Sequence, residues 1–435
     1  MTIHLTLPSL VFLVWTTTVA TAGESPPSPA RQYLHFALTA CDRAETNIPE
    51  LIRVAEIVAD RHIHGGLIGF AHSYQRGHGL DNELWGRSGQ MIHVGFERPW
   101  KTERTETEKE QDILITGWTR APEPGNLEFL KEFKQKKGFL VGFGPRALPE
   151  LAGQVAVCDA WFDTGYGSDD RAVQLSDGSR VGHGNLLRQT IDAWALMGEI
   201  ISACTRRGKM PVIGKSFSYP DGIEWWNRYF QKQQFHDDFE VAPVKPGVMG
   251  RSYIDKIREL IRKYERTQLP NVEKTAGLIV EETVAGRKVA IPTRGHLAWA
   301  FAGREEGRVW AMPPVDAAGE DPPSVVPYLE NTPDHALALH LSDGGQRQED
   351  QEYLRQKQQR VMLITAENPR PEYQLPDDLL RVIDMGWEFG DAAVSIPGYP
   401  IRLLPPSGVM QLIAYETVNV EVLARLVTSK PAARP

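Results

Sequence analysis

Short apolar runs that alternate with stretches of helical periodicity constrain the fold of this chain more than any other feature. The first half contains the runs GGLIGFA, MIHVGF, QDILITGW, FLVGFG and VCDAWFDTG between residues 65 and 165, with helix-like segments between them. Such an alternation is typical of a parallel sheet with helices on both faces. We therefore expect an α/β fold with a doubly wound, five-stranded parallel sheet of the flavodoxin-like type.

The second half repeats the plan of the first. Its apolar runs are AGRKVAIPTRGH, GRVWAMP, DHALALHLSDGG, RVMLITAEN and GDAAVSIPG. Leu67 and Ile113 are 46 residues apart (113 − 67), and their counterparts Lys288 and Ala336 are 48 apart (336 − 288). An ordered series that recurs at similar spacing indicates an internal duplication. We expect two tandem domains of the same class.

The clearest match between the halves is CDAWFD against GDAAVS. Asp159 and Asp391 are each expected to begin a strand that leads through a loop into a long amphipathic helix. The first of these helices is GNLLRQTIDAWALMGEIISACTRRG, and its end is marked by Arg206, Arg207 and Gly208. The second is GVMQLIAYETVNVEVLARL.

The N-terminus resembles an export signal. An apolar run from about Leu5 to Val19 is followed by Ala20-Thr21-Ala22, the small-x-small spacing of a cleavage site. The run has no preceding Lys or Arg, so an uncleaved anchor or a mis-assigned start codon stays an alternative. We expect a signal peptide at 1–22 and a periplasmic or secreted protein. Beyond it we expect no stretch of about 20 apolar residues, hence no further membrane span.

The remaining boundaries follow from composition and periodicity. We expect a Pro/Ser tether and the start of the first helix at 23–44, and that helix to run from about Ile48 to His64. Domain 1 then spans 45–268, including a covering extension at 209–268. Domain 2 spans 269–428, and 429–435 is a tail.

Composition narrows the class of partner. The chain has 435 residues and a net charge of −8, which offers no basic face for nucleic acid. Cys41, Cys158 and Cys204 form no C-x-x-C pair, so we expect buried free thiols rather than disulfides or a zinc site. We expect a small-molecule ligand, no metal, no cofactor and no nucleic acid, with a homodimer as a candidate assembly.

The loop sequences resemble those of the SIS (sugar isomerase) domain family. FAHS followed by ELWGRSG, and then GHGNLL, MPVIGKS and PDGIEWWN, are similar to the motifs of uncharacterised single-domain SIS proteins. The tandem order resembles the isomerase part of glucosamine-fructose-6-phosphate aminotransferase. The resemblance covers about 48–230 and, more loosely, 285–426. It implies sugar-phosphate sites in the loops after the first and third strands.

The resemblance implies a ligand loop and a catalytic residue. Ala71, His72 and Ser73 lie in the loop after the first strand, where a following helix directs its free N–H groups toward a ligand. Glu83 in ELWGR matches the catalytic glutamate of sedoheptulose-7-phosphate isomerase. A carboxylate can move the proton of an aldose-ketose isomerisation. The alternative is an ordinary helix-face pair between Glu83 and Arg87.

Further candidates lie in the other loops. The predicted substrate-binding residues there are Thr119, Arg120, His183, Asn185, Lys215, Ser216, Arg294 and Ser342. Phosphate recognition is left open, because the loop after the third strand lacks the S-x-S-G of sugar-phosphate binders. Trp118 could stack on a sugar or pack in the core.

Two other polar features each have a structural and a functional interpretation. His62 and His64 are expected at the surface rather than on a metal. The acidic cluster of His236, Asp237 and Asp238 in the covering extension could close over a ligand or bind a cation.

These observations favour an exported SIS-domain protein that binds a sugar or sugar derivative, with phosphosugars and amino sugars as candidates. If it is an enzyme, an aldose-ketose isomerase with a carboxylate base is expected. The alternatives are a non-catalytic carbohydrate-binding or sensory protein and, with less support, a muramic-acid-type ether lyase.

Overall fold

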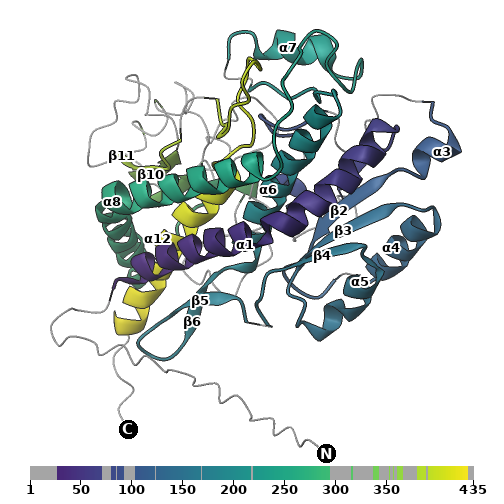
Figure 1. Ribbon diagram of the computed structural model, residues 1–435. Coiled ribbons are helices and arrows are strands. Elements are labelled where there is room, and N and C mark those ends of the chain that lie inside the picture. Colours follow the sequence, from purple (N-terminus) through teal and green to yellow (C-terminus); the bar gives the residue numbers. More distant parts are fainter. Residues whose placement is uncertain are drawn as a thin grey trace, which may run out of the picture.

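The protein is described by a computed structural model (Figure 1). The described residues are 27–70, 80–84, 86–92, 103–122, 124–167, 169–216, 219–293, 315–316, 337–341, 352, 356, 360–365, 380–387 and 390–429. Among them, no helix is long and apolar enough to cross a membrane. The ligand-loop residues Ala71, His72 and Ser73, and also Arg294 and Ser342, lie outside these ranges.

The first half contains a parallel sheet in the order β1-β2-β3-β4. Its strands are β1 (Ile68–Phe70), β2 (Ile113–Gly117), β3 (Phe139–Gly144) and β4 (Ala160–Asp163). The predicted runs at these four places are confirmed as strands. The remaining run, MIHVGF at 91–96, is described only at Met91 and Ile92, so the five-stranded count stays a prediction for this half.

Helices cover both faces of this sheet (Figure 1). On one face lie α1 (Pro29–Ile63) and α6 (Asn185–Arg206), and on the other α4 (Asn126–Gln135) and α5 (Ala152–Val157). Every residue of β1, β2 and β3 is buried, which fits strands covered on both sides. The second face has its own small core of Leu114, Trp118, Leu130, Leu140, Leu148 and Leu151. The α/β prediction with a parallel sheet is confirmed.

Helix α1 begins earlier than expected. Ser28 is its N-cap, with the side chain accepting from Arg31 N, and Pro29 occupies the first helical position, which proline favours. Most of the 23–44 stretch that we expected to include a tether is therefore helical. The sequence signal was ambiguous because Pro and Ser are common both in tethers and at helix starts.

The second half contains a parallel sheet in the order β11-β10-β9-β7-β8. Its strands are β7 (Pro292–Thr293), β8 (Val315–Asp316), β9 (Leu337–Leu341), β10 (Arg360–Thr365) and β11 (Leu380–Asp384). The prediction that GDAAVS forms a strand is wrong. Gly390 and Asp391 have positive φ, and only an isolated bridge joins Val394 to Leu403. The strand that pairs with β10 at the edge of this sheet is instead β11, with the sequence LRVID. Its Arg381 and Asp384 interrupt the apolar pattern.

Four long helices pack together between the sheets. They are α1, α6, α8 (Val248–Val284) and α12 (Ser407–Ser429), and one apolar core contains residues from all of them. Helix α6 is buried on all sides from Asn185 to Thr205, so the polar side of this predicted amphipathic helix faces protein rather than solvent. Its C-terminus agrees with the sequence, since Arg207 is the C-cap and Gly208 has a φ of +68°. The predicted domain boundary at residue 269 lies inside α8.

The remaining elements are short. They are α2 (Leu80–Glu83), α3 (Glu106–Lys109), a 3₁₀ turn (Pro149–Leu151), α7 (Gly222–Tyr229) and an antiparallel ribbon of β5 (Arg171–Gln174) and β6 (Arg180–His183).

A carboxylate lies at the N-terminus of each long helix. Two of these bridge neighbouring helices: Glu421 of α12 accepts from Ala30 N of α1, and Glu199 of α6 accepts from Gly247 N and Gly250 N of α8, both at 2.8 Å. Asp170 accepts from Asn185 N at the start of α6, and Asp391 accepts from Ser407 N at the start of α12. A negative charge there satisfies free N–H groups and complements the helix dipole.

Replacing Glu199 with glutamine is expected to lower the free energy of unfolding by about 2–3 kcal/mol. Glu199 is fully buried, and one of its two N–H donors would then face an NH₂ group. Urea denaturation followed by circular dichroism measures the change. The control is Glu259→Gln, an exposed carboxylate in α8, for which a change below about 0.5 kcal/mol is expected. Equal effects of the two variants would contradict the account.

Candidate functional site

The N-terminal turns of α6 lie at the carboxyl edge of the first sheet. Gln189 Nε2 donates to Trp118 O, just after β2, at 2.6 Å. Thr164, just after β4, donates through its hydroxyl to Asn185 Oδ1 at 2.6 Å, and its carbonyl accepts from Arg188 Nη1. Ligands of open α/β sheets bind outside the carboxyl ends of the strands. This edge is therefore the first place to look for a site.

Asp170 and His183 form a hydrogen-bonded pair there. His183 Nδ1 lies 2.9 Å from Asp170 Oδ1, while Asp170 Oδ2 accepts from Gly184 N at 3.2 Å and Asn185 N at 3.0 Å. Because a carboxylate only accepts, the proton of neutral His183 is on Nδ1 and the lone pair is on Nε2. The His183 side chain is 24% exposed, so a ligand can reach it.

The loop after β2 contributes less than predicted. Thr119 is half-buried and Arg120 is exposed. Both follow Trp118, whose carbonyl accepts from Gln189 near the N-terminus of α6, so they lie close to that helix end. Trp118 itself is fully buried and stacks on Trp161, with ring centroids 5.3 Å apart. The packing interpretation of Trp118 is correct, and a sugar cannot stack on it here.

Glu83, the predicted catalytic residue, is fully buried at the end of α2. Its Oε1 accepts from Trp194 Nε1 of α6 at 2.9 Å. A Cβ added at Gly408 would overlap the carboxylate, so Glu83 lies directly against the first turn of α12. Arg87 Nε donates to the backbone carbonyl of Glu83 at 3.2 Å. The carboxylate thus connects the first half to a helix of the second.

Lys215 and Ser216 lie in a different part of the molecule from His183. Lys215 Nζ binds Asp221, the N-cap of α7, at 2.6 Å and lies over the rings of Tyr219 and Trp225. Ser216 is buried. Helix α7 and the strand β6 that carries His183 are at opposite ends of the view in Figure 1. Among the predicted site residues that the structure describes, Thr119, Arg120, His183 and Asn185 share the carboxyl edge, while Lys215 and Ser216 form a second group.

In the predicted acidic cluster, Asp238 already accepts hydrogen bonds from side chains of the protein itself. Asp238 accepts from Tyr229 at 2.6 Å, from Arg228 at 2.7 Å and from His236 Nδ1 at 2.8 Å. His236 Nε2 in turn lies 2.8 Å from the hydroxyl of Tyr399, and burial lowers the pKa of His236. The cluster holds the covering extension to the second half. Among the described residues, no group of His, Cys, Asp or Glu is arranged to hold a metal ion.

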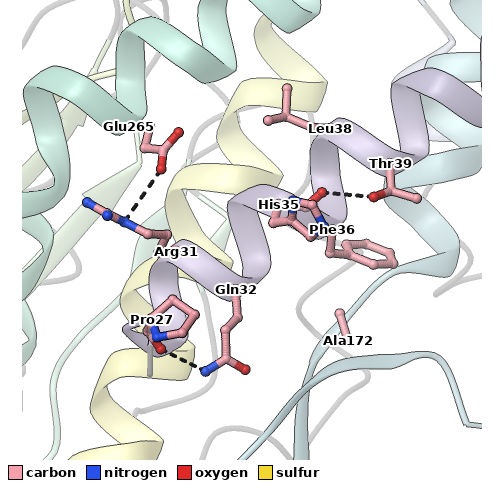
Figure 2. Close-up of a pocket in the computed structure, with 9 residues that line it drawn as sticks. All are labelled: Pro27, Arg31, Gln32, His35, Phe36, Leu38, Thr39, Ala172 and Glu265. Atoms are coloured by element: carbon pink, nitrogen blue, oxygen red, sulfur yellow. Dashed lines mark hydrogen bonds and ion pairs between the residues drawn. The ribbon is translucent and has the colours of Figure 1, made fainter. Parts of the chain in front are cut away.

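A groove of about 600 Å³ follows the outer side of α1 (Figure 2). Its lining includes Arg31, Gln32, His35 and Phe36 from α1, Ala172 from β5 and Glu265 from α8, and Arg31 pairs with Glu265 at 3.5 Å. The predicted site residues do not line this groove. Phe36 is its point of contact with the carboxyl edge, since the ring lies 5.6 Å from the guanidinium of Arg188.

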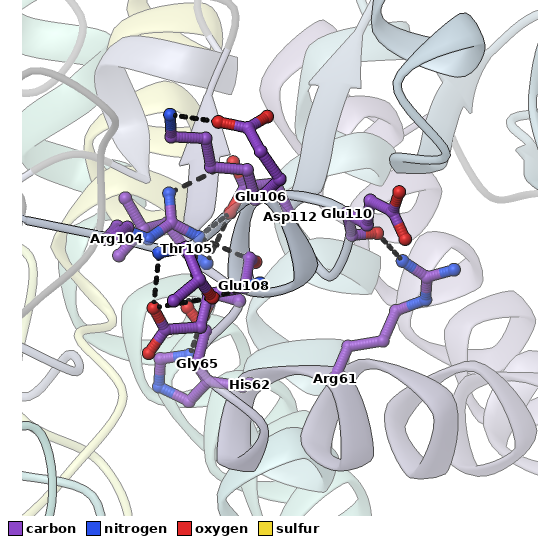
Figure 3. A network of polar contacts seen from close by, with 12 residues as sticks. Arg61, His62, Gly65, Arg104, Thr105, Glu106, Glu108, Glu110 and Asp112 are labelled. Atoms are coloured by element: carbon purple, nitrogen blue, oxygen red, sulfur yellow. Dashed lines mark hydrogen bonds and ion pairs between the residues drawn. The ribbon is translucent and has the colours of Figure 1, made fainter.

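The opposite, amino edge of the sheet is held by a polar network (Figure 3). Arg104 donates to Gly65 O at 3.0 Å and to Asp112, which also accepts from Leu67 N. His62 belongs here: it is buried, with Nδ1 2.8 Å from Gly66 O, so its predicted surface position is wrong. His64 is exposed, as expected. His62 lies inside α1 and continues the buried face of that helix, which includes Val58 and Ala59.

No family model and no curated protein matches the chain. Solved structures that align with most of its length include provisionally assigned phosphosugar isomerases and a provisionally assigned sugar-binding protein. A provisionally assigned sugar-binding protein from Salmonella typhimurium has 8% identity and a TM-score of 0.49, with 91% of this chain and 99% of that chain covered. Provisionally assigned phosphosugar isomerases from Clostridium difficile and Silicibacter pomeroyi have 10% and 11% identity and TM-scores of 0.48 and 0.45. The match to the Clostridium difficile protein covers 94% of this chain and 96% of that protein. The match to the Silicibacter pomeroyi protein covers 92% of this chain and 99% of that protein.

Sequence reasoning missed Asp170 and Arg188. Asp170 lies in a polar loop, 13 residues before its partner His183, without any recognisable motif. Arg188 lies in a helix predicted to be amphipathic, and a single charged residue in such a helix gives no signal of burial.

Proposed function

We propose that the protein binds a sugar or sugar derivative at the carboxyl edge of the first sheet. The carrying observation is that His183 and Asn185, predicted from GHGN, lie together at the N-terminus of α6. Asp170 orients the His183 ring, and Asn185 Oδ1 is taken by Thr164, which leaves the Asn185 amide NH₂ as a donor. Fixed donors and acceptors of this kind suit sugar hydroxyls.

The chain is proposed to be a tandem SIS protein that is exported after removal of residues 1–22. The strand spacing supports the duplication: β1 and β2 start 45 residues apart (113 − 68), and so do β7 and β9 (337 − 292). The next intervals are 26 (139 − 113) against 23 (360 − 337), then 21 (160 − 139) against 20 (380 − 360). In this proposal Ala71, His72 and Ser73 stay candidate ligand-binding residues of the first domain, and Arg294 and Ser342 stay candidates of the second.

The burial of Glu83 favours a protein that binds a sugar over one that isomerises it. A base must come within about 3 Å of the proton that it removes. The Glu83 carboxylate is fully buried and fixed between Trp194 and Gly408. The isomerase stays the second candidate because of a different observation: the His183–Asp170 pair presents an imidazole of defined tautomer at the carboxyl edge.

A binding experiment tests the proposal. The protein from residue 23 onward is titrated calorimetrically with glucose, N-acetylglucosamine, glucosamine 6-phosphate and N-acetylmuramate. At least one should bind, and His183→Gln should weaken it about tenfold through loss of one or two hydrogen bonds. Glu83→Gln should lower the melting temperature and leave the affinity within twofold.

The matched control is His64→Gln, an exposed histidine at the end of α1, which should bind like the wild type. Product analysis of the same mixtures separates the two candidates, because an isomerase converts the aldose and a binding protein returns it unchanged. Wild-type affinity in His183→Gln would place the ligand elsewhere and overturn the proposed site.

A further inference from the structure

Arg188 is a buried cation close to the proposed sugar site. It lies one turn into α6 and is 9% exposed. Its Nη1 donates to Thr164 O, and its guanidinium carbon lies 4.3 Å from the centroid of the Tyr166 ring. Its Nε is buried and has no hydrogen-bond partner among the residues that the structure describes.

No carboxylate compensates this charge within ion-pair distance in the described part of the chain. The nearest candidate along the helix is Asp192, four residues on, whose two oxygens accept from Asn47 at 3.2 Å instead. Burial raises the pKa of Asp192 to about 7, so it is only partly charged at neutral pH. A buried charge that no carboxylate balances within ion-pair distance is costly, and a charged group in such surroundings is a candidate for ligand binding.

A second arginine lies near the Tyr166 phenol. Arg43 donates to Asp163 O at 3.0 Å and lies 3.8 Å from the Asp163 carboxylate, and Arg43 and Arg188 both act on the Tyr166 phenol. The Tyr166 hydroxyl is itself buried without a hydrogen-bond partner among the described residues. Asp170, an acidic group that also acts on this phenol, is engaged by His183 and the N-terminus of α6.

We propose that Arg188 and the Tyr166 hydroxyl bind the anionic group of the ligand, a sugar carboxylate or phosphate. This inference rests on the proposed function and specifies its substrate class. Asn185 and Arg188 are three residues apart on α6 and therefore neighbours on one helix face, about 5–6 Å between Cβ atoms. One sugar can contact Asn185 and His183 with its hydroxyls and Arg188 with its charge. Arginine suits planar carboxylates and phosphates because its donors form a rigid fork.

The test compares neutral and charged forms of one sugar. Glucose, glucuronate and glucose 6-phosphate, and the corresponding galactose series, are titrated into wild type, Arg188→Met and Tyr166→Phe. At least one charged form should bind wild type ten times more tightly than its neutral parent. Arg188→Met should reduce this preference below twofold with the affinity for the neutral parent retained, and Tyr166→Phe should reduce it about threefold.

Stability gives a second readout that a structural arginine would not share. Arg188→Met removes an unpaired buried charge, so the ligand-free melting temperature should stay equal or rise. Arg206→Met is the matched control: Arg206 is on the same helix and paired with Glu56, so its melting temperature should fall and its anion preference should persist. A fall of several degrees in Arg188→Met would show a structural role and overturn the inference.

The outcomes separate the two proposals. Equal wild-type affinity for neutral and charged forms overturns the anion subsite and leaves sugar binding intact. If no sugar binds, the proposed function fails, and inorganic phosphate decides the subsite alone: millimolar phosphate should raise the melting temperature of wild type but not of Arg188→Met. Equal response of both proteins to phosphate overturns the subsite as well.

Discussion

Replacing Gly408 with alanine is expected to lower the free energy of unfolding by about 3 kcal/mol. Alanine normally stabilises a helix over glycine by about 1 kcal/mol, so the expected sign is opposite to the intrinsic propensity. The new methyl group would overlap the Glu83 carboxylate, which is fully buried. Moving Glu83 aside would leave Trp194 Nε1 without its acceptor inside the core. Urea denaturation of both proteins measures the difference.

Two further variants make this prediction specific. Gly277→Ala in α8 is the helical control, because only the end of the Arg425 side chain lies near the added methyl group, and a neutral or stabilising effect is expected. In a Glu83→Ala background, Gly408→Ala should cost little, since the overlapping carboxylate is gone. A full loss of stability in that background would show that the cause is not the contact between the two residues.

Asp192→Asn is expected to stabilise the protein at pH 8 by about 4 kcal/mol, the largest gain that we predict. Burial raises the pKa of Asp192 from 3.8 to about 7. Between pH 3.8 and about pH 7, the folded state therefore keeps a proton that the unfolded chain has already released. The stabilising effect of the protonated form is complete below about pH 4 and is lost as pH rises through 7. The asparagine stays neutral throughout and can still accept a hydrogen bond from Asn47.

The measurement is the difference in unfolding free energy between wild type and Asp192→Asn at several pH values from 4 to 8. It should be near zero at pH 4 and grow toward pH 7, with a slope of at most about 1.4 kcal/mol per pH unit. Asp255→Asn is the control, an exposed aspartate in α8 that is paired with Arg258, and its difference should stay small across the range. A pH-independent difference for Asp192→Asn would contradict a buried, protonated carboxyl.

The sequence predicted the elements whose patterns are local. The runs at β1 to β4, the extent of α6 and α12, and the parallel connection through helices all follow from apolar periodicity and from end signals such as Arg207-Gly208. The strand LRVID was missed because Arg381 and Asp384 lower its apparent hydrophobicity. GDAAVS was mistaken for a strand because alternation of apolar residues says nothing about the positive φ of Asp391.

The candidate site was harder to predict because it depends on long-range contacts. The motif GHGN identified His183 and Asn185, but their orienting partner Asp170 became visible only through the fold. Lys215 matched a family motif equally well and lies beside α7 instead. The burial of α6 on all sides, which makes Arg188 and Asp192 unusual, arises from α8 and α12, more than 40 residues away in sequence.

The most direct test of the central claim is a crystal structure of the protein from residue 23 onward with the tightest-binding sugar from the titrations. The account predicts the sugar at the carboxyl edge of β1–β4, with hydroxyls within hydrogen-bond distance of His183 Nε2 and the Asn185 amide. A sugar bound in the groove along α1, or beside Lys215 and α7, would contradict the proposed site.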